Sequence, residues 1–163
     1  MKKQIKIIKK ANCPKLSKVA KGDLTYHVGY DNSKALHLRV TANTGGGFFS
    51  NEWIALEAIT QIIKSLPFDS PFKATILKPL YQSQGANNHG FLAAALRAEE
   101  ILLPVAKHPL SHTLSDTKSF TKAMQTLIKE KIDLEDDVAA SQRIKDAKRA
   151  EMIAKMKSPY ESL

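Results

Sequence analysis

Residues 36–66 constrain the fold more than any other stretch of the sequence, because a strand pattern, a glycine run and an amphipathic helix pattern follow one another there without a break. In the strand pattern, Leu36, Leu38 and Val40 alternate with polar side chains and therefore share one face. We expect this aliphatic face to be buried in the core of the protein.

The glycine run consists of Gly45, Gly46 and Gly47, whose missing Cβ permits backbone angles that other residues rarely adopt. Ser50 is the predicted N-cap of the helix that follows, so this helix is expected to begin near Asn51. A glycine run before a helix suits either a tight connection or an anion site built from free backbone amides.

The predicted helix covers most of its circumference with apolar side chains and ends at Pro67. A hydrophobic staple supports its start, since Phe49 precedes the cap and Ile54 follows the cap at the required spacing. The apolar positions are Trp53, Leu56, Ile59, Ile62, Ile63 and Leu66. We therefore predict a core helix.

Two further strand patterns precede residue 36, at residues 4–8 and 24–30. Residues 12–14 are expected to break the first of them. A turn at residues 31–34 indicates that the second forms an antiparallel hairpin with the strand that follows. The lysines of the first strand are typical of an exposed sheet edge.

Helix patterns dominate the rest of the chain. Asn87 or Asn88 is the predicted cap of a second core helix, which ends before Pro104. Ser115 and Asp133 are the predicted caps of two later helices, the last of which carries few apolar residues.

The predicted fold class is α+β. An N-terminal antiparallel sheet of two to four strands packs against two core helices, near residues 51–65 and 88–103, and two C-terminal helices follow. One compact domain is expected over residues 1–140, and a charged helical extension over residues 141–163. Residues 72–81 fit either a short helix or an extended link, since a proline interrupts their apolar pattern.

Positive charge is concentrated at the start of the chain. The formal net charge is +9, and residues 1–21 contain eight lysines and no acidic residue. These are Lys2, Lys3, Lys6, Lys9, Lys10, Lys15, Lys18 and Lys21. Such a segment favours contact with the phosphates of a nucleic acid or with an acidic protein surface, and a solvated edge is the structural alternative. The absence of arginine favours loose electrostatic binding over base-specific recognition.

The glycine run does not match the common nucleotide-binding loops. No Lys-Ser or Lys-Thr pair follows it, as a Walker A loop requires, and the spacing of a dinucleotide-binding fold is absent. The order of strand, glycine loop and helix resembles the coenzyme A pyrophosphate loop of the GNAT acetyltransferases, although Ala42 stands where that motif begins with Arg or Gln. The resemblance implies a small acyltransferase as one alternative function.

Two further groups are candidate binding residues. Asn87, Asn88 and His89 lie where the free amides of a helix start converge, although helix capping explains these residues equally well. The aromatic residues on either side of Asn51 would anchor a protein partner if they were exposed, which gives an interaction or inhibitor module as another alternative. These aromatic residues are Phe48, Phe49 and Trp53.

Neither the histidines nor the lone Cys13 forms a recognisable catalytic or metal-binding set. A proline between His108 and His112 excludes continuous helical geometry there. His27 and His37 are expected to form a surface pair on the hairpin. We therefore assign no catalytic residue, no metal ligand and no cofactor.

The main prediction is a non-catalytic cytoplasmic binding protein that engages nucleic acid or a nucleoprotein assembly through its lysine-rich segment. No apolar run reaches the ~20 residues of a membrane span, so no membrane contact is expected. The single cysteine agrees with a reducing compartment. A protein partner is the alternative, and the sequence does not indicate an oligomeric state.

Overall fold

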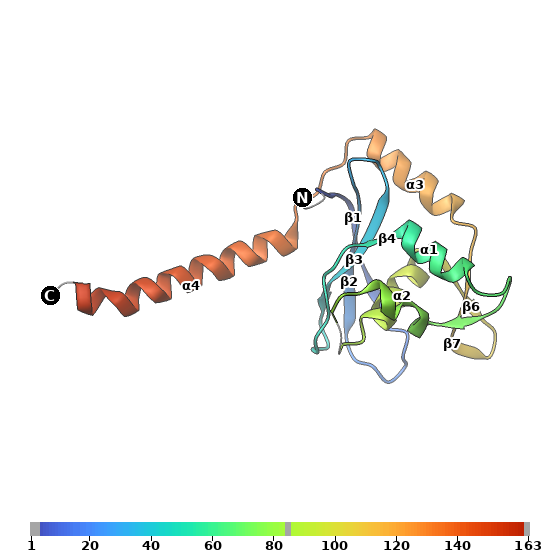
Figure 1. Cartoon of the computed structure of the whole chain (residues 1–163), viewed down its shortest axis with the longest axis horizontal. Coiled ribbons are helices and arrows are strands. Elements are labelled where there is room, and N and C mark those ends of the chain that lie inside the picture. Colours follow the sequence, from blue (N-terminus) through green and yellow to red (C-terminus); the bar gives the residue numbers. More distant parts are fainter. Residues whose placement is uncertain (1–3, 84–85, 162–163) are drawn as a thin grey trace.

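The computed structural model describes residues 4–83 and 86–161, with the side chains of the last helix described as far as residue 156. It confirms the predicted α+β class. The helices α1 (Leu56–Lys64) and α2 (Asn88–Ala98) lie between a four-stranded antiparallel sheet and a smaller three-stranded sheet (Figure 1).

The first sheet has the strand order β1-β2-β3-β4, and all neighbours are antiparallel. Its strands are β1 (Lys6–Pro14), β2 (Asp23–Tyr30), β3 (Leu36–Asn43) and β4 (Ile54–Ala55). The predicted hairpin of β2 and β3 is confirmed. The predicted break at residues 12–14 is wrong, because all three residues pair with β2. Proline is tolerated at the end of an edge strand, where its missing N–H costs little.

The helix after the glycine run begins at Leu56, five residues later than predicted. Ile54 does not staple a helix start but pairs with Leu38 in the sheet, and this pairing keeps the backbone extended. The Ser50 hydroxyl donates to Glu52, and the Glu52 amide donates to the same hydroxyl. Ser50 therefore stabilises a local turn in the extended segment and caps no helix.

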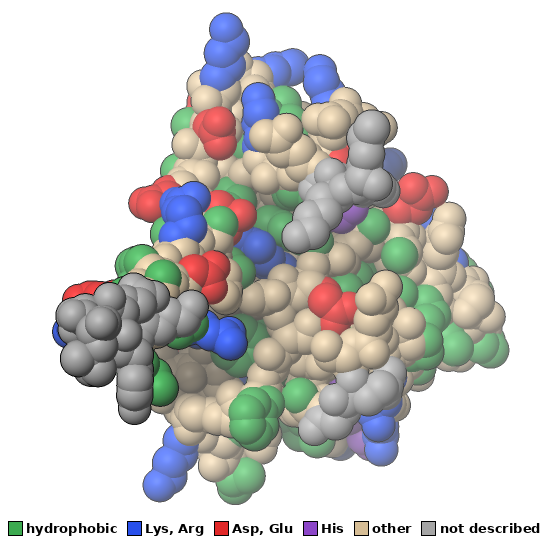
Figure 2. Space-filling view, turned by 60° about the vertical axis from the view of Figure 1, so that its left-hand side comes forward, with side chains coloured by type: hydrophobic (Ala, Val, Ile, Leu, Met, Phe, Trp, Pro, Cys, Tyr) green, Lys and Arg blue, Asp and Glu red, His purple; other side chains and the backbone are tan. Residues whose placement is uncertain are grey.

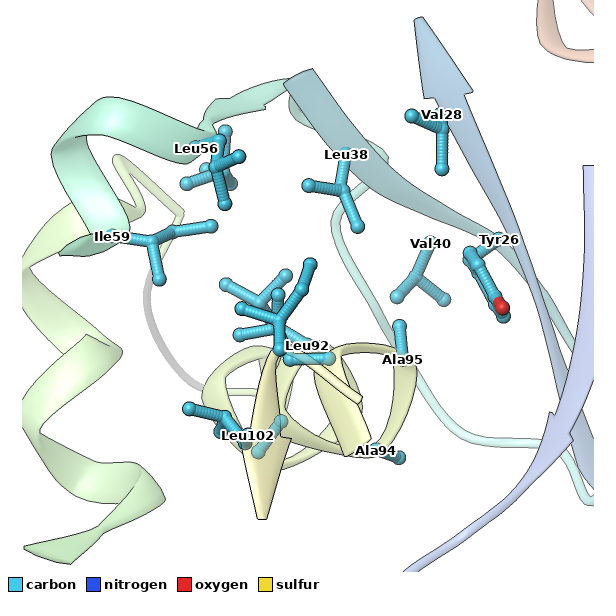
Figure 3. Packing of buried hydrophobic residues seen from close by; sticks show 14 of the residues in the cluster. Tyr26, Val28, Leu38, Val40, Leu56, Ile59, Leu92, Ala94, Ala95 and Leu102 are labelled. Carbon is cyan, nitrogen blue, oxygen red and sulfur yellow. The ribbon is translucent and has the colours of Figure 1, made fainter. Parts of the chain in front are cut away.

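The inner face of the first sheet carries the hydrophobic core. Tyr26 and Val28 of β2 and Leu38 and Val40 of β3 face the two helices (Figure 3). The three alanines at residues 93–95 of α2 are buried, and their small side chains let this helix approach the strands closely. The predicted position of this helix in the core is confirmed, since Leu56, Ile59 and Ile63 of α1 are buried.

The second sheet has the strand order β5-β7-β6. Its strands are β5 (Phe72–Lys73), β6 (Leu102–Val105) and β7 (His108–Leu114). The 3-10 helix η1 (Ala74–Leu80) follows β5, so the segment left open over residues 72–81 is a short strand and then a 3-10 helix.

The second core helix ends at Ala98, so the part of it predicted over residues 99–103 is wrong. Glu100 adopts a φ of 60°, and the amides of Glu100 and Ile101 bond to carbonyl oxygens of the last helical turns. Many helices end with such a left-handed residue, which is usually glycine. Because this residue is a glutamate, the sequence does not indicate that the helix ends here. The apolar residues from Leu102 onward belong to β6.

The helix α3 (Lys118–Lys129) packs Phe120 and Met124 against the core. Asp116, and not the predicted Ser115, accepts the amide of the first helical residue. The Ser115 hydroxyl donates instead to the carbonyl oxygen of Glu100 and so ties this connection to the end of α2.

The last helix, α4 (Asp137–Glu161), begins after Asp136, whose carboxylate accepts a first-turn amide, and not after the predicted Asp133. Figure 1 shows α4 extending away from the two sheets, and its residues 141–156 are exposed. The domain boundary at residue 141 stays a prediction. Within the described ranges, none of the helices is both long enough and apolar enough to cross a membrane.

Gly45 and Gly46 are expected to respond differently to the same added methyl group. A Cβ on Gly45 would lie 2.0 Å from the carbonyl oxygen of Lys21, so Gly45→Ala must push two loops apart. Gly46 has a φ of +80° and nothing within 4 Å of an added Cβ. Gly46→Ala therefore costs only backbone strain, about 1–2 kcal/mol.

Thermal unfolding followed by circular dichroism measures both effects. We expect the melting temperature to fall in both variants and to fall further in Gly45→Ala. Wild-type melting temperatures in both variants would contradict the close contact between the loops and the strain at Gly46.

Candidate functional site

Four segments that are distant in sequence enclose a cavity of about 260 Å³, which we call the loop cavity. They are the β1–β2 loop (residues 15–22), the junction of β5 with η1 (residues 73–75), the first turn of α2 (residues 87–91) and part of β7 (residues 110–112). Mostly apolar cavities with a few convergent polar groups are the usual places where small ligands bind.

Local contacts hold the β1–β2 loop over the cavity. The Lys15 ammonium donates a hydrogen bond to the Lys21 carbonyl oxygen over 2.8 Å, which closes the loop on itself. Gly22 has a φ of +85°, and its missing side chain leaves room for Gly45 of the neighbouring loop. Leu16 packs against the core. The loop is therefore attached at both of its ends.

The described lining of the loop cavity is positively charged and contains no carboxylate. Among the described residues that line it, Lys15 and Lys73 are cationic and none is acidic. Burial lowers the pKa of His89, which also lines the cavity, and the nearby ammonium of Lys78 lowers it further. The start of α2 adds backbone amides that no side chain caps and the positive end of the helix dipole.

His112 is the buried polar group of the loop cavity, with 1% of its surface exposed. Its Nδ1 lies 3.2 Å from Nη1 of Arg97. Because a guanidinium only donates, Nδ1 must accept, and the ring proton resides on Nε2. Burial, and then the positive charge of Arg97, lower the pKa of His112 to about 4. At pH 7 His112 is therefore a neutral ring that presents an Nε2–H donor.

Apolar side chains form most of the remaining wall. Leu16, Phe91 and Leu110 are the larger apolar residues that line the cavity. The Lys15 ammonium lies 5.5 Å from the centre of the Phe91 ring, within cation–π range. A ligand that combines a negative charge with a flat, largely apolar body matches this lining.

The structure divides the lysine-rich segment between different surroundings. Lys9 forms an ion pair with Glu99 over 2.8 Å, and Lys10 forms one with Asp137 over 2.9 Å. The exposed lysines of the segment are Lys6, Lys18 and Lys21, while Lys2 and Lys3 lie outside the described residues. Figure 2 shows the basic side chains of one face scattered among acidic and uncharged ones. Among the described residues of the segment, only those in the β1–β2 loop line the loop cavity, and Lys15 is the lysine among them.

Two groups that were predicted separately meet in the loop cavity. Lys15 of the lysine-rich segment and Asn87 and His89 of the α2 start all line it. Asn88 is buried beside it and accepts the amide of Ser50 over 2.7 Å. The predicted side-chain cap is wrong, because Asn87 occupies the N-cap position without a side-chain hydrogen bond to the helix.

The glycine run lies against the β1–β2 loop and not against a helix. Because α1 begins only at Leu56, no helix N-terminus follows Gly45, Gly46 and Gly47 directly. The anion site suggested for this glycine run requires a helix N-terminus directly after the glycines. The glycines instead form a tight connection in which Gly46 and Gly47 adopt positive φ angles.

The three aromatic residues near the glycine run have different surroundings. Phe48 is 92% exposed, whereas Phe49 packs against the core. Trp53 stacks with Arg39, whose Cζ lies 4.2 Å from the centre of its ring. Asn51 is exposed. Of the predicted aromatic anchor, Phe48 alone is free to meet a partner.

The outer face of the first sheet carries a second polar group, the outer-face cluster, which consists of His27, Arg39, Asp136 and Asp137. His27 lies opposite Arg39 in the strand register, and both are buried. The predicted surface pair of His27 and His37 is therefore wrong, and the His37 ring lies 3.0 Å from a carboxylate oxygen of Asp31.

The outer-face cluster holds the start of α4 against the sheet. Arg39 Nη2 donates to Asp136 Oδ1 over 2.7 Å, and His27 Nε2 lies 3.5 Å from Asp137 Oδ2. Burial, and then the positive charge of Arg39, lower the pKa of His27 to about 4. These contacts explain the outer-face cluster as a structural connection between the first sheet and the start of α4.

His112, Lys73 and Phe91 are cavity residues that the sequence did not indicate. The strand β7 was not expected, so His112 had no predicted face. Leu110, His112 and Leu114 alternate with Ser111 and Thr113, and this period of two is the signal that could have indicated the strand.

Comparisons with protein-family models, with curated proteins and with solved structures find no match. Among residues 4–83 and 86–161, no group of three or more His, Cys, Asp or Glu side chains could hold a metal ion. The function is therefore inferred from the geometry of the loop cavity.

Acidification is expected to destabilise the protein through two of its buried histidines, His27 and His112. Both have a pKa of about 4 in the folded state, below the ordinary value of about 6.5. The unfolded chain therefore binds protons that the folded chain does not bind. Stability should be highest above pH 6.5 and fall toward pH 4, by on the order of 1–3 kcal/mol per histidine.

Urea unfolding at a series of pH values between 7 and 4 measures this slope. His27→Gln and His112→Gln should each make stability less dependent on pH, whereas His108→Gln, at an exposed position, should leave the slope unchanged. A wild-type stability that stays constant over this range would contradict the assignment.

Proposed function

We propose that this chain is a non-catalytic binding protein for single-stranded nucleic acid, which it binds at the loop cavity and the lysines around it. One observation carries the proposal: Lys15 and Lys73 line a cavity without a described acidic residue, and the exposed Lys18 and Lys21 belong to the loop above it. Such a surface attracts the phosphate groups of a nucleic acid, because each contact releases counterions from the nucleic acid.

The shape of the site favours a single strand over a duplex. Unpaired bases can enter a cavity, and proteins that bind single strands combine a cationic groove with aromatic side chains. Phe91 lines the loop cavity. Phe48 is exposed directly after the glycine run. This run touches the β1–β2 loop where Gly45 meets Lys21. These two rings provide aromatic surface near the lysines.

The proposed interface is narrower than the lysine-rich segment. Lys9 and Lys10 are neutralised by Glu99 and Asp137, so they contribute little attraction for phosphate. The described residues that line the loop cavity include no arginine. Lysine acts on phosphate as a point charge, so this part of the interface should be sensitive to salt and tolerant of sequence.

We also propose a cytoplasmic location. The chain contains one cysteine, Cys13, and its thiol is buried. Burial, with the negative charges of Asp23 and Glu99, raises the pKa of this thiol to about 11. An unreactive, unpaired thiol agrees with a reducing compartment.

A protein partner is the second candidate, and the exposure of Phe48 favours it. Capture of a partner from native lysate that survives nuclease, and that Phe48→Ala abolishes, would support this candidate. Phe68→Ala is the matched control, because Phe68 is equally exposed on a different loop. The acyltransferase alternative has no such support, since no helix start directly follows the glycine run.

Replacing Lys18, Lys21 and Lys73 with glutamine is expected to weaken binding to a labelled single-stranded oligonucleotide by about tenfold or more at 0.1 M salt. Three lost phosphate contacts should also reduce the slope of log affinity against log salt concentration by up to about 2. Fluorescence anisotropy titrations at several salt concentrations measure both quantities.

The control replaces Lys64, Lys122 and Lys131 with glutamine, which removes the same charge from exposed positions on other elements. Equal losses in the two triple variants would mean that net charge, and not this site, drives binding. Unchanged affinity in the first variant would contradict the proposed interface.

A further inference from the structure

We propose that the loop cavity is a binding site for a single nucleotide, which places its phosphate at the cationic opening and its base beside His112. This inference names the ligand class of the proposed nucleic-acid site and rests on that proposed function for its biological setting. The size of the cavity, its positive charge and the imidazole of His112 in its lining support it independently.

The size of the cavity favours one nucleotide. Its volume is about 260 Å³. Sites for drug-sized molecules typically measure roughly 300–1,000 Å³. The loop cavity therefore suits a single ring system with a charged group at the opening, and it is too small to enclose a dinucleotide.

The opening provides the groups that a phosphate requires. Lys15 and Lys73 contribute two ammonium groups, and the hydroxyl-bearing Ser17 and Thr75 line the same cavity. The first turn of α2 contributes backbone amides that no side chain caps. Because none of the described lining residues is acidic, no carboxylate repels a phosphate dianion there.

His112 supplies a group that a base can satisfy. Its Nε2–H can donate a hydrogen bond to a carbonyl oxygen or a ring nitrogen on the edge of a base. A sugar phosphate alone offers no such acceptor at the end of a flat ring. A ligand that carries such an acceptor on the edge of a ring can form a hydrogen bond with this donor.

Arg97 is a positioning residue for this interaction. It lies 3.2 Å from Nδ1 of His112 and so keeps the ring proton on Nε2. The Phe72 ring, with its centre 6.0 Å from that of the imidazole, packs beside it. The apolar side chains of Leu16 and Phe91 line the same space and suit the faces of a base.

Titration of the full-length chain with nucleoside 5′-monophosphates tests the site. The probes are adenosine and uridine 5′-monophosphate, with ribose 5-phosphate and inorganic phosphate as ligands without a base. We expect at least one monophosphate to bind about tenfold more tightly than ribose 5-phosphate, as one hydrogen bond between His112 and the base implies. In nitrogen-15 NMR spectra, the amide signals of residues 15–20 and 87–91 should shift.

His112→Phe keeps an aromatic ring in place and removes the donor. It is expected to lower monophosphate affinity to that of ribose 5-phosphate and to leave the affinity for ribose 5-phosphate unchanged. His108→Phe, at an exposed position of the same strand, should change neither affinity. Arg97→Gln should convert the imidazole signals of His112 from one Nε2-protonated tautomer into a mixture of two.

If His112→Phe fails to fold, the NMR spectrum of the wild-type protein tests the site. The free protein must show His112 protonated on Nε2, and this signal must move when a monophosphate is added. Equal affinity for monophosphates and ribose 5-phosphate, or an unmoved His112 signal, would overturn the site.

The two proposals fail in different ways. Oligonucleotide binding without monophosphate binding in the cavity would overturn this inference and leave the proposed function standing. Monophosphate binding without oligonucleotide binding would support the nucleotide site and remove the proposed function.

Discussion

The antiparallel pairing of β2 with β3 is the constraint on which the rest of the structure depends. It places Val28 opposite Leu38 and so builds a continuous aliphatic face for α1 and α2. The same register places His27 opposite Arg39 on the other face, where they meet the start of α4. A shift of one residue would exchange the two faces, so the hydrophobic core and the outer-face cluster are specified together.

Packing on the aliphatic face also determines where the loop cavity forms. The alanines at residues 93–95 bring α2 close to the sheet, and the first turn of this helix then lies beside the β1–β2 loop. The turn at Glu100 ends the helix and sends the chain back as β6 and β7. The strand β7 thereby carries His112 to the cavity, where Arg97 of α2 determines which ring nitrogen holds the proton.

The candidate site could be predicted only in part. Lys15, Asn87 and His89 were recognised because clustered charge and a helix start are local signals, but nothing local indicated that they share a cavity. The number of lysines in residues 1–21 also suggested a larger cationic surface than the structure has. Lys9 and Lys10 meet carboxylates far away in the chain, so charge counted along the sequence is not charge exposed to a ligand.

The sequence by itself determined the α+β class, the β2–β3 hairpin and the core position of α1, because each follows from a periodicity of two or of 3.6 residues. The tertiary structure decided where the helices begin and end. Sheet pairing of Ile54 delays α1, and a left-handed glutamate at residue 100 ends α2. The tertiary structure also decided where the loop cavity forms. Packing of distant segments brings the side chains of Lys15 and His112 together, and no local sequence pattern indicates this.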